Sequence, residues 1–356
     1  MSDEEKPRSK PANENPWYCL ATVYGEQGKA ESERDDLPLS LFDDNLASKN
    51  REAWNRWIAS ALLDAQRAEL LKKGFDSSEL APLTTEERTE FLKAFAKRTT
   101  AVPPDPQEAV SFTSVLFERP ISFCGFVFLD AFFHRAAFAH SADFDKAVFF
   151  GPASFYRATF ASYAAFSSAT FSDEADFGEA LFSGEAFFGG VTFSGDTKFY
   201  GTTFSRGAHF NRAAFSSDVE FHKATFSHQA YFPETVFSGS NGFTACEFKS
   251  HTFFAGTKFL SDVPDFRDAK LREATEWHDA QWPAWPKDKL AAQYQVYAFE
   301  RLKAEMERLR KHEDEQFFFA KELCARRALL WFKCLDGEED IRAESDQPEL
   351  YPQALK

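Results

Sequence analysis

The sequence predicts a mainly β fold, a solenoid of short strands with helical segments at both ends. The first observation behind this prediction is a series of phenylalanines that recur from position i to position i+11, without exception, from Phe138 to Phe259. A second series lies between them, from Phe144 to Phe254, so that the spacing alternates between 6 and 5. With 43 Phe among 356 residues, chance does not produce this register, and the stretch is an internal repeat.

The second observation concerns the residue two positions before each Phe, which is nearly always small. Ala158 precedes Phe160 in this way, and Ala164 precedes Phe166. Side chains two residues apart on a strand point to the same face, whereas steps of 5 and 6 fit no single face of a helix. We therefore expect Phe rings to fill the inside of the solenoid beside the small residues. Residue i should stack over residue i+22, which places Phe160 over Phe182, with strands about 4.8 Å apart.

Motifs within the repeat, such as Ala158-Thr159-Phe160 and Ala224-Thr225-Phe226, resemble the pentapeptide-repeat family. That family has a small residue at position i−2 and Leu or Phe at the centre, and the resemblance covers roughly residues 112–282. It implies a right-handed quadrilateral β-helix with four short faces per coil. The alternating spacing departs from the strict five-residue unit, and resembles a Phe-centred bacterial branch with one extra residue in every second unit.

Composition and charge argue against several classes of function. The formal net charge of −15 disfavours non-specific binding to nucleic acid or to anionic membranes. We find no secretory signal and no run of about 18 apolar residues. The five cysteines are scattered and indicate reduced thiols, so we expect a cytoplasmic protein.

The residues before the repeat divide into two parts. Residues 1–15 are polar and charged, and are predicted to be disordered. Residues 16–109 are predicted to form a helical block and a linker into the solenoid. Because a solenoid end exposes strand edges and apolar side chains, the block is expected to cap the first coil, with an independent domain as the alternative.

Within the helical block, the apolar run over residues 16–25 indicates either a strand or an anchor packed on the next helix. Apolar residues at helical intervals then predict a single helix from about Leu46 to Lys73. Thr84 and Glu87 fit a capping box and open a second helix, which ends near residue 98.

The repeat weakens after Phe259 and is predicted to end by residue 286. The inward positions continue at uneven spacing, as expected for a terminal repeat, through Phe266, Leu271, Trp277 and Trp282. The solenoid is therefore predicted over residues 110–286.

Two further helices are predicted after the solenoid, over residues 287–311 and 315–335, with a turn at residues 312–314. They would form a hairpin over residues 287–336, followed by an acidic tail over residues 337–356. In bacterial members of the family such a hairpin often leads into membrane segments. Here those segments are absent, which indicates either a soluble variant or a truncated chain.

No arrangement of residues typical of catalysis occurs in the sequence. It contains no nucleophile elbow, no phosphate-binding Gly loop and no HExxH motif, and its histidines lack metal-ligand spacing with Cys or Asp. We therefore expect no enzyme activity, no cofactor and no metal.

Outward-facing aromatic residues provide the candidate partner surface. If residue i stacks over residue i+22, one outward column contains Phe187, His209, Tyr231 and Phe253. Exposed apolar patches often mark interaction sites, and the alternative is that terminal helices cover this column. The last helix adds four aromatic residues beyond what one helix pair can bury, namely Phe317, Phe318, Phe319 and Trp331.

These features predict a rigid scaffold that binds another protein. They also predict a homo-oligomer, of which a dimer is one form, that associates through the hairpin, the aromatic column or both. Basic residues flank the aromatic cluster of the last helix, so contact with a membrane surface is an alternative for that helix. The resemblance implies a second function, an acidic mimic of duplex DNA that binds a type II topoisomerase. Residues 110–282 contain 20 acidic and 13 basic residues, a net charge of −7 that is mild for such a mimic. A third interpretation is the soluble sensor part of a membrane-associated protein. Direct nucleic-acid binding is not expected.

Overall fold

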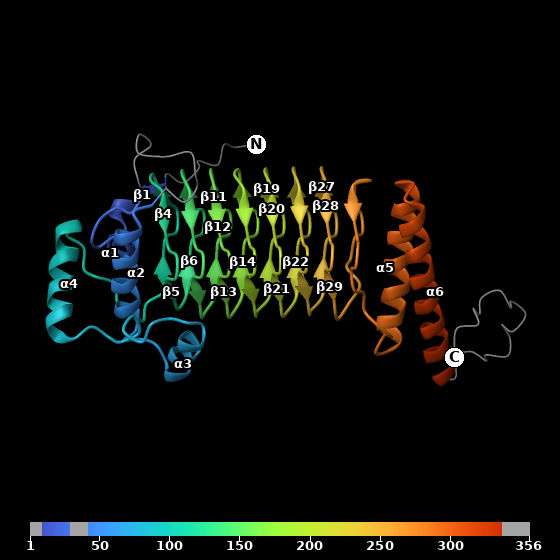
Figure 1. The fold of residues 1–356 in the computed structure, drawn as a ribbon, viewed down its shortest axis with the longest axis horizontal. Coiled ribbons are helices and arrows are strands. Elements are labelled where there is room, and N and C mark those ends of the chain that lie inside the picture. Colours follow the sequence, from blue (N-terminus) through green and yellow to red (C-terminus); the bar gives the residue numbers. More distant parts are fainter. Residues whose placement is uncertain (1–8, 29–41, 337–356) are drawn as a thin grey trace, which may run out of the picture.

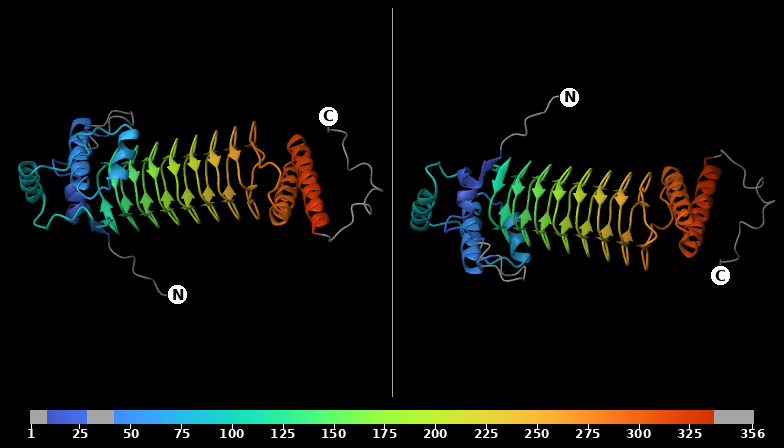
Figure 2. Two further views of the ribbon diagram at one scale, coloured as in Figure 1. Left: turned by 90° about the horizontal axis from the view of Figure 1, so that it is seen from below. Right: turned by 90° about the horizontal axis from the view of Figure 1, so that it is seen from above.

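The computed structural model describes residues 9–28 and 42–336. Its centre is a four-sided parallel β-solenoid, with helices at both ends of the rod (Figure 1). Each coil contributes one short strand to each of four sheets, and strands within a sheet are parallel. Views from above and below show the same arrangement, with α1–α4 at one end and α5 and α6 at the other (Figure 2). The predicted quadrilateral β-helix is confirmed.

The four sheets are called the first to fourth faces. The first face contains β1 (Lys10–Pro11), β3 (Val115–Phe117), β7 (Ala137–Phe138), β11 (Thr159–Phe160), β15 (Leu181–Phe182), β19 (Thr203–Phe204), β23 (Thr225–Phe226) and β27 (Glu247–Phe248). The second face contains β2 (Val110–Ser111), β6 (Ala131–Phe132), β10 (Ala153–Ser154), β14 (Ala175–Asp176), β18 (Thr197–Lys198), β22 (Val219–Glu220) and β26 (Asn241–Gly242).

The third face contains β4 (Ile121–Ser122), β8 (Ala142–Asp143), β12 (Ala164–Ala165), β16 (Ala186–Phe187), β20 (Ala208–His209), β24 (Ala230–Tyr231), β28 (Thr252–Phe253) and β30 (Thr275–Glu276). The fourth face contains β5 (Val127–Phe128), β9 (Val148–Phe149), β13 (Thr170–Phe171), β17 (Thr192–Phe193), β21 (Ala214–Phe215), β25 (Val236–Phe237) and β29 (Lys258–Phe259). Along the chain the faces follow one another as second, first, third and fourth, so the second and third faces lie on opposite sides of the rod.

Ladders of buried phenylalanine fill the solenoid. Phe160 pairs with Phe182 in neighbouring strands, and their ring centroids are 4.7 Å apart with planes 3° apart. The predicted stacking of residue i over residue i+22 is therefore confirmed. The ladders of the second and third faces also meet across the interior, where Phe166 and Phe177 make an edge-to-face contact at 5.4 Å and 89°. Stacked and edge-to-face arrangements are both favourable for aromatic rings.

The alternating spacing follows from two kinds of corner. After a Phe of the second or third face, the chain makes a tight turn. The residue two positions after that Phe has a positive φ. In one such turn Glu179 has a φ of 53°, and the Ala180 N–H donates to the Phe177 carbonyl at 3.1 Å. The next Phe is five residues on. The corners after the first and fourth faces are one residue longer, which gives the step of six.

The end coils depart slightly from the i to i+22 register. Val110 pairs with Ala131, so the offset at the first coil is one residue shorter than in the middle of the rod. Thr252 pairs with Thr275, so the offset at the last coil is one residue longer. The aromatic ladder nevertheless continues into the last coil, where Phe254 stacks on Trp277 at 4.6 Å and 5°. The predicted continuation through Phe266, Leu271, Trp277 and Trp282 is confirmed.

The N-terminal helices cap the first coil. They are α1 (Pro16–Ala21), α2 (Asp44–Ile58), α3 (Asp64–Lys72) and α4 (Thr85–Arg98), preceded by the short 3₁₀ helix η1 (Ala12–Glu14). Trp54 of α2 packs on Phe126, and its indole N–H donates to the Val127 carbonyl at 2.7 Å. The Asn55 side chain donates to the Gly125 carbonyl at 3.0 Å and accepts from the Val127 N–H at 2.9 Å. Its amide thus takes the place of the missing strand at this edge.

Several local predictions for the N-terminal block need correction. Residues 1–15 are not wholly disordered, because β1 pairs with β3 and the Lys10 N–H donates to the Ser114 carbonyl at 2.9 Å; residues 1–8 lie outside the described residues. The run over residues 16–25 begins as helix α1 rather than as a strand, because the Asn15 side chain caps its first turn, and a turn follows Ala21. It does pack on the next helix, with the Trp17 and Trp54 rings 5.6 Å apart.

The single helix predicted over residues 46–73 is two helices, α2 and α3. The Gln66 side chain accepts from the Leu63 N–H at 2.9 Å, so a capping contact starts a new helix after the chain has turned. The turn allows both Leu62 and Leu70 to be buried. The predicted capping box of Thr84 with Glu87 is confirmed at the start of α4.

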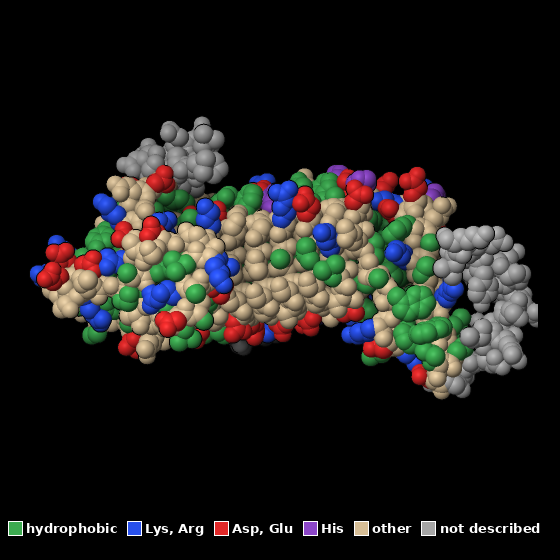
Figure 3. Space-filling view, turned by 60° about the horizontal axis from the view of Figure 1, so that its bottom comes forward, with side chains coloured by type: hydrophobic (Ala, Val, Ile, Leu, Met, Phe, Trp, Pro, Cys, Tyr) green, Lys and Arg blue, Asp and Glu red, His purple; other side chains and the backbone are tan. Residues whose placement is uncertain are grey.

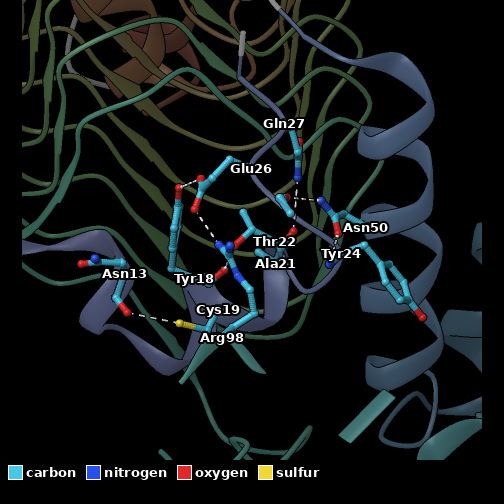
Figure 4. A network of polar contacts seen from close by, with 11 residues as sticks. Asn13, Tyr18, Cys19, Ala21, Thr22, Tyr24, Glu26, Gln27, Asn50 and Arg98 are labelled. Atoms are coloured by element: carbon cyan, nitrogen blue, oxygen red, sulfur yellow. Dashed lines mark hydrogen bonds and ion pairs between the residues drawn. The ribbon is translucent and has the colours of Figure 1, made fainter. Parts of the chain in front are cut away.

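A polar network ties the end of α4 to α1 (Figure 4). Arg98 donates to the Thr22 hydroxyl at 2.8 Å and to the Glu26 carboxylate at 2.5 Å. The Tyr18 hydroxyl also donates to Glu26. Burial and the nearby Glu26 carboxylate raise the pKa of Tyr18 well above its usual value, so the phenol stays protonated and keeps this hydrogen bond.

The C-terminal hairpin consists of α5 (Lys289–Arg308) and α6 (His312–Leu335). Phe318 of α6 packs edge-to-face on Trp282 at 5.0 Å, so the hairpin covers the last coil. The turn predicted at residues 312–314 is wrong, because α6 already begins at His312. Three acidic residues in its first turn, at positions 313–315, favour a helix N-terminus there.

No helix among the described residues is long and apolar enough to cross a membrane. The acidic tail predicted over residues 337–356 lies outside the described residues.

Candidate partner-binding surfaces

Strands β16, β20, β24 and β28 bring the predicted aromatic column together on the outside of the third face. The four rings stack in order, with centroids 4.6 Å apart for Phe187 and His209, 4.7 Å for His209 and Tyr231, and 4.9 Å for Tyr231 and Phe253. The planes of each pair lie within 8° of one another. All four side chains are partly exposed. We call these four residues the aromatic ladder.

Two further rings lie next to the ends of the aromatic ladder. Tyr163 lies against Phe187 at 4.8 Å, and His251 lies beside Phe253 at 6.1 Å. The sequence column did not contain these two residues. His251 lies two positions before Phe253, and Tyr163 lies two positions before Ala165, which pairs with Phe187 one coil on. The rule that side chains at i and i−2 share a face could have found both. Because stacking occupies the ring faces, the ladder offers a partner mainly the edges of its rings, which carry positive partial charge.

The surroundings of the ladder are flat and weakly charged. One flank, two residues after each ladder strand, contains only small or uncharged residues, namely Gly189, Asn211, Pro233 and Ala255. On the other flank, Glu185 pairs with His209 at 3.0 Å. A Cβ on Gly207 would lie 2.3 Å from the Glu185 carboxylate and 2.8 Å from the His209 ring, so this glycine makes room for the pair.

Helices α1, α2 and α4 stand at one end of the rod and α5 and α6 at the other (Figure 2). Helix α3 lies beside the first coils (Figure 1), where Lys73 at its end donates to the Thr170 hydroxyl of the fourth face at 3.2 Å. In the described part of the chain, no ring contact joins a helix to the aromatic ladder. The alternative in which those helices cover the column is therefore not what the structure shows.

A groove of about 740 Å³ lies between the last coil and α5, beside the end of the ladder. His251 lines it together with the basic residues Lys249, Lys270, Arg272 and Arg308. Two acidic residues, Glu273 and Glu305, also line the groove, so its charge is mixed with a basic excess.

Acidic residues gather on the second face, opposite the ladder. Four exposed carboxylates immediately precede strands β6, β14, β18 and β22, namely Asp130, Glu174, Asp196 and Asp218. Figure 3 shows acidic side chains along one edge of the rod. Basic residues of neighbouring coils pair with part of this charge, since Lys198 contacts Glu174 at 2.5 Å and Arg157 contacts Glu179 at 2.8 Å.

The hairpin contributes three of the four aromatic residues predicted for it. Phe317, Phe319 and Trp331 are 43%, 46% and 49% exposed. Phe318 is fully buried between α5 and the last coil, so it is a core residue and cannot contact a partner. The sequence run of three consecutive Phe does not say which one faces the solenoid. Figure 3 shows the exposed hydrophobic side chains gathered on the hairpin.

The described residues contain no group of three or more His, Cys, Asp or Glu that could hold a metal ion. One carboxyl, that of Asp143, stands out because burial raises its pKa to about 6. It accepts from the Ser122 hydroxyl and the Asp145 N–H, each at 2.9 Å. Both bonds hold the corner of a coil, so its role is structural.

The geometry defines the class of this protein, a repeat solenoid of short strands with Phe at the inward centre of each unit. A family model described as Pentapeptide repeats (9 copies) matches residues 133–181 and 177–225. Residues 133–225, in the middle of the solenoid, are therefore pentapeptide repeats. Comparisons with curated proteins and with solved structures found no match for the chain.

Proposed function

We propose that this protein is a non-enzymatic, rigid scaffold that binds another protein through the aromatic ladder. The observation that carries the proposal is the outward stack of Phe187, His209, Tyr231 and Phe253 on a flat, weakly charged face. We place the protein in the cytoplasm, in keeping with its five cysteines, all of which are free thiols.

Physical reasons favour the ladder over the rest of the rod. Aromatic residues supply a large share of binding energy at protein interfaces. The ladder rings are already held by their neighbours, so binding freezes few additional side-chain rotations. The first and fourth faces instead present mainly Thr, Ser, Ala and Val, as at Thr203 and Thr192.

We also propose that the protein is not an enzyme. The inside of the rod is filled by Phe rings, and the histidine of the ladder contacts a single carboxylate, that of Glu185. Nucleophilic catalysis needs a nucleophile within hydrogen-bonding reach of a general base, and His209 has no such neighbour among its described contacts.

The acidic column on the second face favours a second candidate, the mimic of duplex DNA that binds a type II topoisomerase. Its carboxylates recur once per coil, as at Glu174, Asp196 and Asp218. The ion pair of Glu174 with Lys198 weakens this candidate. The wild type and Tyr231→Ser would then both bind a topoisomerase, and the double variant Asp196→Lys with Asp218→Lys would not. That result would establish the DNA mimic in place of binding through the ladder.

The experiment is capture of partners from native cytoplasm on three immobilised proteins, followed by quantitative mass spectrometry. The ladder variant carries Phe187→Ser and Tyr231→Ser. The matched control carries Thr203→Ser and Thr225→Ser on the first face. We expect a set of proteins that the control retains and the ladder variant loses, while thermal melting shows all three to be folded. Equal capture by the ladder variant would contradict the proposal.

A further inference from the structure

The groove between the last coil and α5 is continuous with the aromatic ladder through His251. The His251 ring lies 6.1 Å from the ring of Phe253, the last residue of the ladder, and His251 also lines the groove. The volume of the groove, about 740 Å³, is typical of ligand sites. A protein that lies along the ladder therefore reaches the groove at this end of the rod.

Contacts between α5 and the last coil hold the walls of the groove in place. Arg308 of α5 donates to the Leu271 carbonyl at 3.1 Å, and the Glu305 carboxylate accepts from the same guanidinium at 2.6 Å. Leu271 is buried, and Leu309 adds apolar lining beside it. Because these walls are formed in the free protein, a ligand meets a surface that needs little further ordering.

Positive charge in the groove is only partly neutralised. Lys249 and Lys270 share one carboxylate, that of Glu247, with Lys249 at 3.6 Å. Arg272 is exposed and forms no ion pair within the described chain. Glu273 also lines the groove, so the charge is mixed, with a basic excess on a chain whose net charge is −15.

We propose that an acidic segment of the partner protein docks in this groove. Its carboxylates contact Arg272 and Lys249, and its apolar side chains pack on the lining at Leu309. The inference rests on the proposed function, because it joins the groove and the aromatic ladder into one surface for one partner. Charge in the groove then sets the direction in which that partner lies along the ladder.

The mixed charge favours a peptide over a nucleic acid. Glu273 and Glu305 line the groove among its basic residues, so closely spaced phosphates would also meet carboxylates. The net charge of the chain opposes a long polyanion as well. A peptide carries its carboxylates further apart, with apolar side chains between them, and this pattern matches the groove.

The first test measures the binding of a synthetic acidic peptide to the full chain by fluorescence polarisation. The probe is a fluorescein-labelled hexapeptide of alternating Leu and Glu, and its control is the same peptide with Gln in place of Glu. We expect a dissociation constant on the order of 0.1–1 mM for the Glu peptide and one at least about tenfold higher for the Gln peptide. Absence of binding, or equal binding of the two peptides, overturns the proposal.

The second test locates the peptide with a matched pair of charge reversals. Arg272→Glu should raise the dissociation constant of the Glu peptide about tenfold. Lys223→Glu should leave it unchanged, because Lys223 is also exposed and without an ion pair in the described chain but lies in a tight turn after the second face. An unchanged constant for Arg272→Glu, or an equal rise in both variants, shows that the peptide does not bind in the groove.

Competition separates carboxylates from phosphates. Inorganic phosphate should displace the Glu peptide no better than sodium chloride at the same ionic strength, and a single-stranded DNA oligomer should not displace it. Stronger displacement by either phosphate compound would assign the groove to phosphate groups and overturn the proposal.

Partner capture with Arg272→Glu separates this inference from the proposed function. We expect the partner to be lost both by Arg272→Glu and by the ladder variant, Phe187→Ser with Tyr231→Ser. A partner lost by the ladder variant and kept by Arg272→Glu would overturn the role of the groove and leave binding through the ladder standing. A partner lost by Arg272→Glu and kept by the ladder variant would contradict the proposed function and leave the groove as the binding site.

Discussion

The rings of Phe187 and His209 lie face to face on the outside of the solenoid, with centroids 4.6 Å apart and planes 3° apart. They stack because strands β16 and β20 pair in register, one coil apart, as the buried Phe rings beneath them also do. The repeat that builds the core therefore also arranges the surface. A partner meets a row of side chains whose positions are fixed before binding.

The first prediction concerns the buried ladder. Phe193 is fully buried and stacks on Phe171 and Phe215 at 4.9 and 5.0 Å, whereas Ser194 points outward and is exposed. Phe193→Ala should lower the free energy of unfolding by about 3–5 kcal/mol, as for other buried aromatic residues. Ser194→Ala should be nearly neutral. Urea unfolding checks both, and equal losses would contradict the inward and outward assignment.

The second prediction compares two buried threonines. The Thr202 hydroxyl donates to the Phe177 carbonyl at 2.7 Å, while the Thr252 hydroxyl has no hydrogen-bond partner within the described chain. Thr202→Val should lower the free energy of unfolding by about 1 kcal/mol, the usual value of one hydrogen bond. Thr252→Val removes an unsatisfied polar group and should be neutral or stabilising. Denaturant midpoints that fall equally for both variants would rule out this difference.

The third prediction concerns the tight turns. Ala245 has a φ of 56°, in the left-handed region that disfavours residues with a Cβ, and Gly201 occupies the equivalent turn position with a φ of 63°. Ala245→Gly should raise the free energy of unfolding by up to about 1 kcal/mol, and Gly201→Ala should lower it by about 1 kcal/mol. Thermal melting of both variants checks the signs, and a change of the same sign in both would be inconsistent with strain at this position.

The fourth prediction concerns pH. Because burial raises the folded-state pKa of Asp143 to about 6, from an ordinary value of 3.8, the folded protein keeps a proton that the unfolded chain loses in this interval. The stability from this group is present below about pH 4 and is lost as pH rises through about 6. Asp143→Asn should therefore be more stable than the wild type at neutral pH, by on the order of 2 kcal/mol. The difference in free energy of unfolding between Asp143→Asn and the wild type should become smaller as the pH falls toward 4.

Urea unfolding at several pH values measures the Asp143 effect, with Asp130→Asn as the control because Asp130 is exposed. A stability difference between wild type and Asp143→Asn that stays constant with pH would show that the carboxyl does not titrate in this interval.

The coil register and the aromatic column were predictable because the period is strict. Once residue i stacks over i+22, the neighbours of Phe187 follow by counting. The helical ends have no such period, and their packing depends on tertiary contacts. Nothing in the sequence distinguishes Asn55 from other residues of its helix. Only the structure shows that its side chain completes the hydrogen bonding at the edge of a sheet.

The part of the candidate site that lies on the solenoid was predictable from the strict period of the repeat. Phe187 and Tyr231 could be placed from the repeat. Phe318 could not, because three consecutive Phe in a helix point in three directions, and the last coil determines which one is buried.

Site-specific photo-cross-linking in living cells tests the central claim, binding through the aromatic ladder, most directly. A benzophenone side chain replaces Tyr231 on the ladder in one variant and Thr203 on the first face in another, at a similar height along the rod. We predict a covalent adduct with another protein from position 231 and none from position 203. An adduct from position 203, with none from 231, would contradict the account.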